Sequence, residues 1–152
     1  MRVERLLDAN ATADIDAIVL LEAHSFTNPW SRETLVWELR NSDVTRVYLL
    51  RDDQRQILAF CVCWLIFDEL HINTLAVARP ARRAGLATRL LRDVMAEAAK
   101  DGGKKATLEV RASNTAALAL YGRLGFQIAA KRPRYYTQPE EDALILWREN
   151  LD

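Results

Sequence analysis

The chain has 152 residues, of which 50% are hydrophobic and 28% charged, a balance that is typical of one globular domain and excludes a largely disordered or fibrous chain. Its 21 basic residues offset 21 acidic ones, so no overall basic field would attract nucleic acid. The longest apolar run, residues 57–67, is too short for a membrane span, and charges among residues 1–10 argue against a signal peptide, so we expect a cytoplasmic protein.

The N-terminal part of the chain predicts a strand and two short helices. Residues 3–7 read as a strand, and residues 14–23 have helical spacing. The turns of this helix carry Ile15, Ile18, Val19 and Leu21 or Glu22. The segment 27–31 breaks the helix, and Ser31 is a suitable N-cap for a second helix that runs through Leu39.

Three strands are predicted next, at residues 44–51, 57–66 and 69–77. Their lengths and polar turns favour an antiparallel meander. The middle strand contains Cys61 and Cys63, which are too close in sequence for an ordinary disulfide. We expect two buried, reduced thiols with no chemical role.

The second half alternates helices and strands. It predicts a helix at 85–100, a strand at 106–110, a helix at 115–124 and strands at 126–130 and 142–147. The first of these helices connects two strands, and a right-handed crossover would place those strands side by side and parallel. We therefore predict a single α/β domain.

The loop at residues 78–88 lies between a predicted strand and a predicted helix N-terminus, a natural anion site because backbone N–H groups and the helix dipole point there. Gly85 lets the backbone approach a phosphate, and Ala87 leaves room for it. Positive charge comes from Arg82, Arg83 and Arg89. The alternative is that Gly85 only helps the backbone turn into the helix and that the arginines form a solvated surface. The loop is neither a Walker loop nor a GxGxxG motif.

Residues 82–87 resemble the R/Q-x-x-G-x-G/A signature of the GCN5-related N-acetyltransferase (GNAT) superfamily. Further stretches are similar to RimI-type ribosomal-protein alanine N-acetyltransferases over essentially the full chain. These stretches are NPWS at 28–31, DELHINTLAV at 68–77, LEVRASNTAALALYGRLGF at 108–126, RPRYY at 132–136 and EDA at 141–143.

The resemblance implies a single GNAT-fold domain over residues 1–152, with a mixed, mostly antiparallel sheet, a splayed parallel strand pair and flanking helices. It implies an acetyl-CoA co-substrate and no metal. The acetyl acceptor would be the N-terminal alanine, or a similar small residue, of a ribosomal protein, attacking directly in a ternary complex. We expect no direct nucleic-acid or membrane partner, and a monomer or weak dimer.

The resemblance also implies two catalytic residues. The family's general base matches Glu109, which would otherwise form a salt bridge with Arg111 or Lys105 on a solvated face. The family's general acid matches Tyr121, whose helical spacing also fits an ordinary core tyrosine.

A larger set of residues would hold the cofactor. By resemblance these residues are Leu75, Ala76, Val77, Arg83, Ala84, Gly85, Leu86, Ala87, Thr88 and Asn114. The three strand residues could equally belong to an ordinary interior strand. Ser113 or Asn114 is also a good N-cap for the following helix.

Four residues resemble family residues around the peptide entrance. They are Trp30, Arg132, Tyr135 and Tyr136. The alternative is a hairpin with ordinary surface aromatics, and His24 and His71 are interpreted as structural.

Two other functions remain open. One is a GNAT enzyme acting on a small amine or a lysine side chain, which the glycine loop alone would fit. The other is a non-catalytic acyl-CoA-binding regulatory module, which would keep the loop but not need Glu109 and Tyr121.

Overall fold

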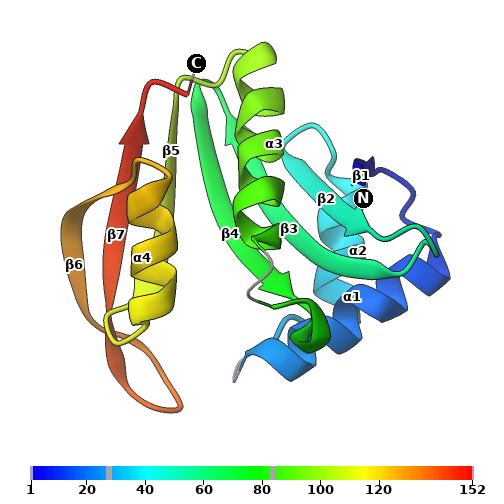
Figure 1. The fold of residues 1–152 in the computed structure, drawn as a ribbon, viewed down its shortest axis with the longest axis horizontal. Coiled ribbons are helices and arrows are strands. Elements are labelled where there is room, and N and C mark those ends of the chain that lie inside the picture. Colours follow the sequence, from blue (N-terminus) through cyan, green and yellow to red (C-terminus); the bar gives the residue numbers. More distant parts are fainter. Residues whose placement is uncertain (1, 27–28, 83–84, 152) are drawn as a thin grey trace.

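The computed structural model describes residues 2–26, 29–82 and 85–151, which form one sheet with helices on both faces (Figure 1). The elements in chain order are β1 (Arg2–Leu6), α1 (Thr12–Ser25), α2 (Arg32–Arg40), β2 (Thr45–Arg51), β3 (Ile57–Ile66), β4 (Glu69–Val77), a 3-10 turn η1 (Arg79–Ala81), α3 (Leu86–Lys100), β5 (Lys105–Arg111), α4 (Thr115–Arg123), β6 (Gln127–Tyr136) and β7 (Glu141–Glu149). The strand order is β1-β2-β3-β4-β5-β7-β6.

The sheet confirms the predicted α/β class and its mixed strand directions. Strands β2, β3 and β4 form the predicted antiparallel meander, and β4 and β5 are the parallel pair. The other neighbouring strand pairs are antiparallel. No helix among residues 2–26, 29–82 and 85–151 has the length and apolar character needed to cross a membrane.

Two helical layers cover opposite faces of the sheet, with α3 and α4 on one face and α1 and α2 on the other (Figure 1). The apolar stripe predicted for α3 is buried in the larger core cluster, where Leu90, Leu91 and Val94 have no exposed surface. A second cluster under α1 and α2 buries Ile15 and Ile18. The molecule therefore has one core on each side of the sheet. The face to which a strand side chain points determines which helices it contacts.

Strands β4 and β5 form a fork. Their parallel pairing joins Glu69–Ile72 to residues 105–108 and ends there, although β5 continues to pair with β7 as far as Arg111. Figure 1 shows the two strands diverging beyond that point. Among the described strands, none pairs with β4 on this side after Ile72, so the backbone of residues 73–77 forms an internal edge.

A β-bulge lies at the start of this edge. The β3–β4 register moves from Cys63 opposite Ile72 to Val62 opposite Thr74, which leaves Asn73 as an extra residue. Side chains normally alternate between the two faces of a strand, and one extra residue shifts that alternation. Leu70 and Ile72 join the α3-side core, whereas Ala76 joins the α1–α2 core and Thr74 meets α1.

The predicted element boundaries agree with the structure to within two residues, with one larger error. The strand predicted at 126–130 is wrong in length, because β6 extends to Tyr136. The strand continues through Pro133, because β6 is the last strand of the sheet. An edge strand tolerates proline because one row of its N–H groups needs no ladder partner.

Local predictions about caps and cysteines are confirmed. The Ser31 side chain accepts a hydrogen bond from the Thr34 backbone N–H at the start of α2. Cys61 and Cys63 are free and fully buried.

Candidate active site

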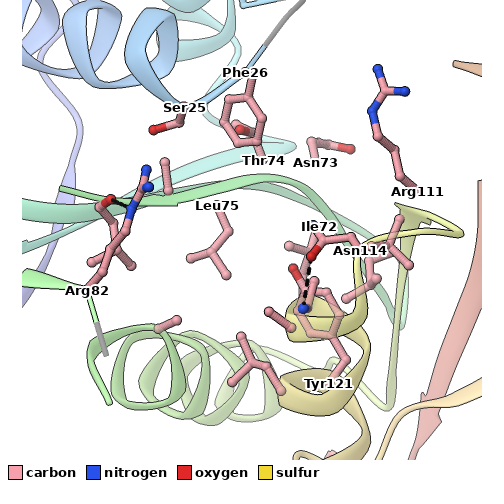
Figure 2. Close-up of a pocket in the computed structure, with 18 of the residues that line it drawn as sticks. Ser25, Phe26, Ile72, Asn73, Thr74, Leu75, Arg82, Arg111, Asn114 and Tyr121 are labelled. Carbon is pink, nitrogen blue, oxygen red and sulfur yellow. Dashed lines mark hydrogen bonds between the residues drawn. The ribbon is translucent and has the colours of Figure 1, made fainter. Parts of the chain in front are cut away.

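An open cleft of about 810 Å³ lies at the fork between β4 and β5 (Figure 2). It collects most of the predicted site residues, although they are spread over more than a hundred positions of the chain. Those that line it are Trp30, Leu75, Ala76, Val77, Gly85, Leu86, Ala87, Thr88, Glu109, Asn114, Tyr121 and Tyr136. Arg83 and Ala84 lie outside the described residues.

The N-terminus of α3 forms one end of this cleft. Gly85 is the N-cap residue and has the left-handed conformation, with φ of 74°, and the next three residues also line the cleft. The first N–H groups of a helix have no partner within the helix and carry the positive end of its dipole. The Arg82 Nε atom donates to the Val77 carbonyl at 3.0 Å, which ties the loop to the end of β4 (Figure 2). This end of the cleft is suited to bind a phosphate group.

The internal edge of β4 forms the wall that leads away from the phosphate end. Leu75, Ala76 and Val77 line the cleft there, and the Leu75 side chain points toward α3 (Figure 2). An extended ligand can form backbone hydrogen bonds with such an edge. The cleft is therefore suited to a long, narrow ligand with a phosphate group that binds at α3 and a linear chain that runs along β4.

Glu109 is the first residue of β5 beyond the last residue paired with β4. Its carboxylate lies 3.3 Å from Arg132 Nη1, and its side chain is 33% exposed. Tyr135 also interacts with Glu109, and burial together with this carboxylate raises the pKa of the Tyr135 phenol. Because the ion pair is exposed, it contributes at most about 1 kcal/mol. It orients the carboxylate but can open when a ligand enters.

The salt bridges considered as alternatives for Glu109 are not the ones that form. The Arg111 guanidinium pairs with Glu141 at 3.5 Å, and Lys105 pairs with Glu69 at 3.6 Å. Arg132 therefore contacts Glu109 instead of lining the cleft. Sequence spacing could not predict this contact because β6 reaches β5 only across β7.

Tyr121 lies on α4 at the floor of the cleft (Figure 2). Its ring packs edge-on against Phe126 with 5.8 Å between centroids, so it is partly a core tyrosine. Burial is the main cause of a strongly raised pKa of the Tyr121 phenol. The hydroxyl therefore stays protonated at neutral pH and is able to donate a proton or a hydrogen bond.

Asn114 combines a structural role with a place in the cleft. Its side-chain oxygen accepts a hydrogen bond from the Ala117 N–H at 3.1 Å, which caps α4 as predicted (Figure 2). The rest of the residue lines the cleft beside Tyr121.

The hairpin of β6 and β7 is anchored to the end of β5 at the mouth of the cleft. Arg111 donates to the backbone carbonyls of Pro139 and Thr137 at 2.9 and 2.8 Å. Its guanidinium lies over the Tyr136 ring, 4.6 Å from the centroid. Burial raises the pKa of Tyr136 to about 12. The two neighbouring tyrosine rings, of Tyr135 and Tyr136, pack edge-to-face at 5.0 Å.

Several residues that line the cleft were not predicted as site residues, among them Glu22, Phe26, Asn73 and Arg111. Glu22 had a signal, because a carboxylate within the apolar stripe of a helix needs a buried partner. Asn73 is polar, but β4 also contains Glu69, His71 and Thr74, so its polarity was a weaker signal. Phe26 follows the end of α1 and carries no distinguishing pattern.

Among the described residues, no group of three or more His, Cys, Asp or Glu side chains is placed to hold a metal ion. The cleft offers hydrogen-bond donors at a helix N-terminus, a free backbone edge, a carboxylate and a neutral phenol. These groups suit the transfer of an acyl group from an anionic carrier to a nucleophile.

Comparison with known proteins gives a consistent result. The sequence pattern described as the acetyltransferase (GNAT) family matches residues 13–126. The chain is 35% identical over 138 residues to a ribosomal protein bS18-alanine N-acetyltransferase of Salmonella typhimurium, covering 90% of this chain and 91% of the relative.

Solved structures show the same similarity. The crystal structure of the ribosomal-protein-S18-alanine N-acetyltransferase from Escherichia coli matches with a TM-score of 0.86 and 32% identity, over 98% of this chain and 93% of that chain. A chain of the NatC complex bound to Gag peptide and CoA matches with a TM-score of 0.82, over 98% of this chain and 99% of that chain. Its 23% identity supports likeness of fold alone.

Proposed function

Because this chain belongs to the acetyltransferase (GNAT) family, we propose that it transfers the acetyl group of acetyl-CoA to the N-terminal α-amino group of a protein. The acceptor is an N-terminal alanine, or a similar small residue, of a ribosomal protein, as the names of its relatives describe for them. The observation that carries the proposal is that Glu109 and Tyr121 line the same cleft as the N-terminus of α3.

The donor would occupy the α3 end of the cleft and the edge of β4. The pyrophosphate of acetyl-CoA would accept hydrogen bonds from the backbone at residues 85–88, and the pantetheine arm would run along Leu75, Ala76 and Val77. Backbone N–H groups near Val77 would stabilise negative charge on the thioester oxygen. Asn114 would contact the same arm from the other side of the fork.

The amine would then attack the thioester carbon directly, without a covalent enzyme intermediate. A C–N bond forms, the C–S bond breaks, and Glu109 takes the amine proton, directly or through water. Tyr121 gives its proton to the departing thiolate. The buried thiols Cys61 and Cys63 take no part.

The acid–base chemistry favours an α-amine over a lysine side chain. An α-amino group has a pKa near about 8, so roughly a tenth of it is neutral at pH 7, whereas a lysine amine near about 10.4 is almost wholly protonated. A carboxylate of ordinary basicity is sufficient for the first acceptor. Trp30, Tyr135, Tyr136 and Arg132 would bind the first residues of the peptide around this amine.

We further propose that residues 1–152 act as a single N-acetyltransferase domain, since one sheet runs through all the described strands. A ribosomal-protein substrate implies action in the cytoplasm. The zero net charge supports recognition of the protein rather than of nucleic acid. We expect the enzyme to be a monomer or a weak dimer.

The acceptor assignment is tested by offering acetyl-CoA with peptides that begin with Ala, Ser, Thr, Met or Gly, together with an internal-lysine peptide and spermidine. Fragmentation mass spectrometry would locate the added acetyl group. We expect α-amino acetylation that is greatest on Ala. Acetylation confined to lysine or spermidine would overturn the acceptor class, and binding of acetyl-CoA without any transfer would favour a regulatory module.

A second prediction concerns the donor loop. Within the described part of the chain, an added Cβ at Gly85 meets no heavy atom within 4 Å, so in the ligand-free protein a substitution there is strained chiefly by its φ of 74°. A left-handed conformation costs an ordinary L-residue roughly 1–2 kcal/mol. We therefore expect Gly85→Val to weaken acetyl-CoA binding about tenfold, measured by calorimetry. Gly85→Asn is the matched control and should bind more tightly than the valine variant, because Asn tolerates this conformation. Equal binding by both variants would contradict the backbone explanation.

A further inference from the structure

Glu22 is a buried carboxylate in the cleft that the proposed chemistry does not use. It lies on α1, has only 3% of its surface exposed, and lines the same cleft as Glu109. Burial raises the pKa of Glu22, and hydrogen bonds from its neighbours oppose the rise. Burying a carboxylate costs free energy that its hydrogen bonds must offset, and those hydrogen bonds can fix the position of the groups that donate them.

Its two oxygens hold two separate parts of the chain. Oε1 accepts a hydrogen bond from the Trp30 backbone N–H at 3.2 Å, and Oε2 accepts one from the Thr74 hydroxyl at 3.1 Å. Trp30 lies in the connection between α1 and α2, and Thr74 follows the bulge in β4. Glu22 therefore links helix α1, this connection and the start of the internal strand edge.

The bulge is what makes the second link possible. Because Asn73 is an extra residue, Thr74 faces α1 rather than α3, and Leu75 faces α3. Figure 2 shows Phe26 and Thr74 on the α1 side of β4, with Leu75 directed to the opposite side. The hydrogen bonds of Glu22 thus lie on the face opposite the N-terminus of α3.

We propose, on the basis of the function proposed above, that Glu22 is a positioning residue that fixes the acceptor side of the cleft through its hydrogen bonds to Trp30 and Thr74. The donor side does not depend on it in the same way. Residues 74–77 of β4 are held independently by pairing with β3. The Trp30 backbone, in contrast, belongs to neither a helix nor a strand, and its N–H group bonds to Glu22.

The test compares Glu22→Leu with Glu22→Gln. Leucine leaves the Trp30 N–H and the Thr74 hydroxyl without their acceptor. Glutamine can accept from Trp30 and donate to the Thr74 hydroxyl, which can act as an acceptor. We expect Glu22→Leu to raise the KM for an Ala-initiated peptide about tenfold or more, with the Kd for CoA changed less than about twofold. Glu22→Gln should keep the peptide KM within about threefold of the wild-type value.

Glu38 supplies a matched control for loss of a buried carboxylate. It is 4% exposed on α2 and accepts hydrogen bonds from Thr45 Oγ1 at 2.5 Å and Trp64 Nε1 at 2.9 Å. It does not line the cleft. Glu38→Leu should lower Tm but leave the peptide KM unchanged. An equal rise in KM for both leucine variants, or a glutamine variant as impaired as Glu22→Leu, would overturn the positioning role.

A measurement without catalysis separates this proposal from the proposed function. Amide hydrogen exchange of Trp30 in the ligand-free protein should accelerate at least about tenfold in Glu22→Leu and stay near the wild-type rate in Glu22→Gln. Unchanged exchange in Glu22→Leu would overturn the link. Failure of the wild-type protein to acetylate any peptide would instead count against the proposed function and leave the exchange result valid.

Discussion

Glu109→Gln is expected to lower kcat by about 100-fold or more, with little change in acetyl-CoA binding. Glutamine keeps the size of the side chain and its ability to accept a hydrogen bond from Arg132, which lies 3.3 Å away. It lacks the basicity needed to take a proton from the amine. The measurement is steady-state turnover of an Ala-initiated peptide, with the Kd for CoA determined separately.

Glu69→Gln is the control for Glu109→Gln, because Glu69 lies on the strand that neighbours β5 in the same sheet. Glu69 on β4 is also a partly exposed carboxylate, which pairs with Lys105 and contacts His71, but it does not line the cleft. Glu69→Gln should leave turnover within about twofold of wild type. Near-normal turnover in Glu109→Gln would remove Glu109 from the mechanism and leave its contact with Arg132 as a purely structural ion pair.

Tyr121→Phe is expected to lower kcat by a similar factor, about 100-fold or more. The ring and its 5.8 Å contact with Phe126 are retained, so the substitution removes only the hydroxyl. Burial raises the pKa of this phenol, and a neutral hydroxyl is the form that can protonate a thiolate. Stopped-flow or steady-state release of CoA measures the effect, while acetyl-CoA affinity should change little.

Tyr48→Phe provides the comparison for loss of a buried tyrosine hydroxyl. Tyr48 is 3% exposed, and its hydroxyl accepts a hydrogen bond from Arg46 at 3.3 Å. It does not line the cleft, so its removal should affect stability rather than turnover. If both phenylalanine variants kept normal turnover, proton donation by Tyr121 would be excluded, and the thiolate would leave without acid catalysis.

Local sequence patterns predicted most of the fold. The apolar stripe of α3, the apolar run of β3 and the cap residues Ser31 and Asn114 depend on patterns within a few positions of the chain. The loop at Gly85 was also predicted from a local feature, because its place between a strand and a helix N-terminus makes it a candidate anion site. These features could be predicted because their physical causes are local.

The features that were missed depend on contacts between distant segments. The bulge at Asn73 is a property of pairing with β3 and has no marker in the letters of β4 alone. The contact between Arg132 and Glu109 requires the β5-β7-β6 strand order, which places the last strand at the edge. Glu22 could have been identified as unusual, but its partners Trp30 and Thr74 could not.

The cleft at the fork between β4 and β5 is lined by residues of α1 on one face of the sheet and of α3 and α4 on the other. With the proposed donor site on the α3 face and the proposed acceptor site on the α1 face, the two substrates would approach the cleft from opposite faces of the sheet. A macromolecular acceptor would then need to insert only its first residues and would leave the α3 face open for spent CoA to depart. Exchange of the small carrier and docking of the large partner can therefore proceed independently.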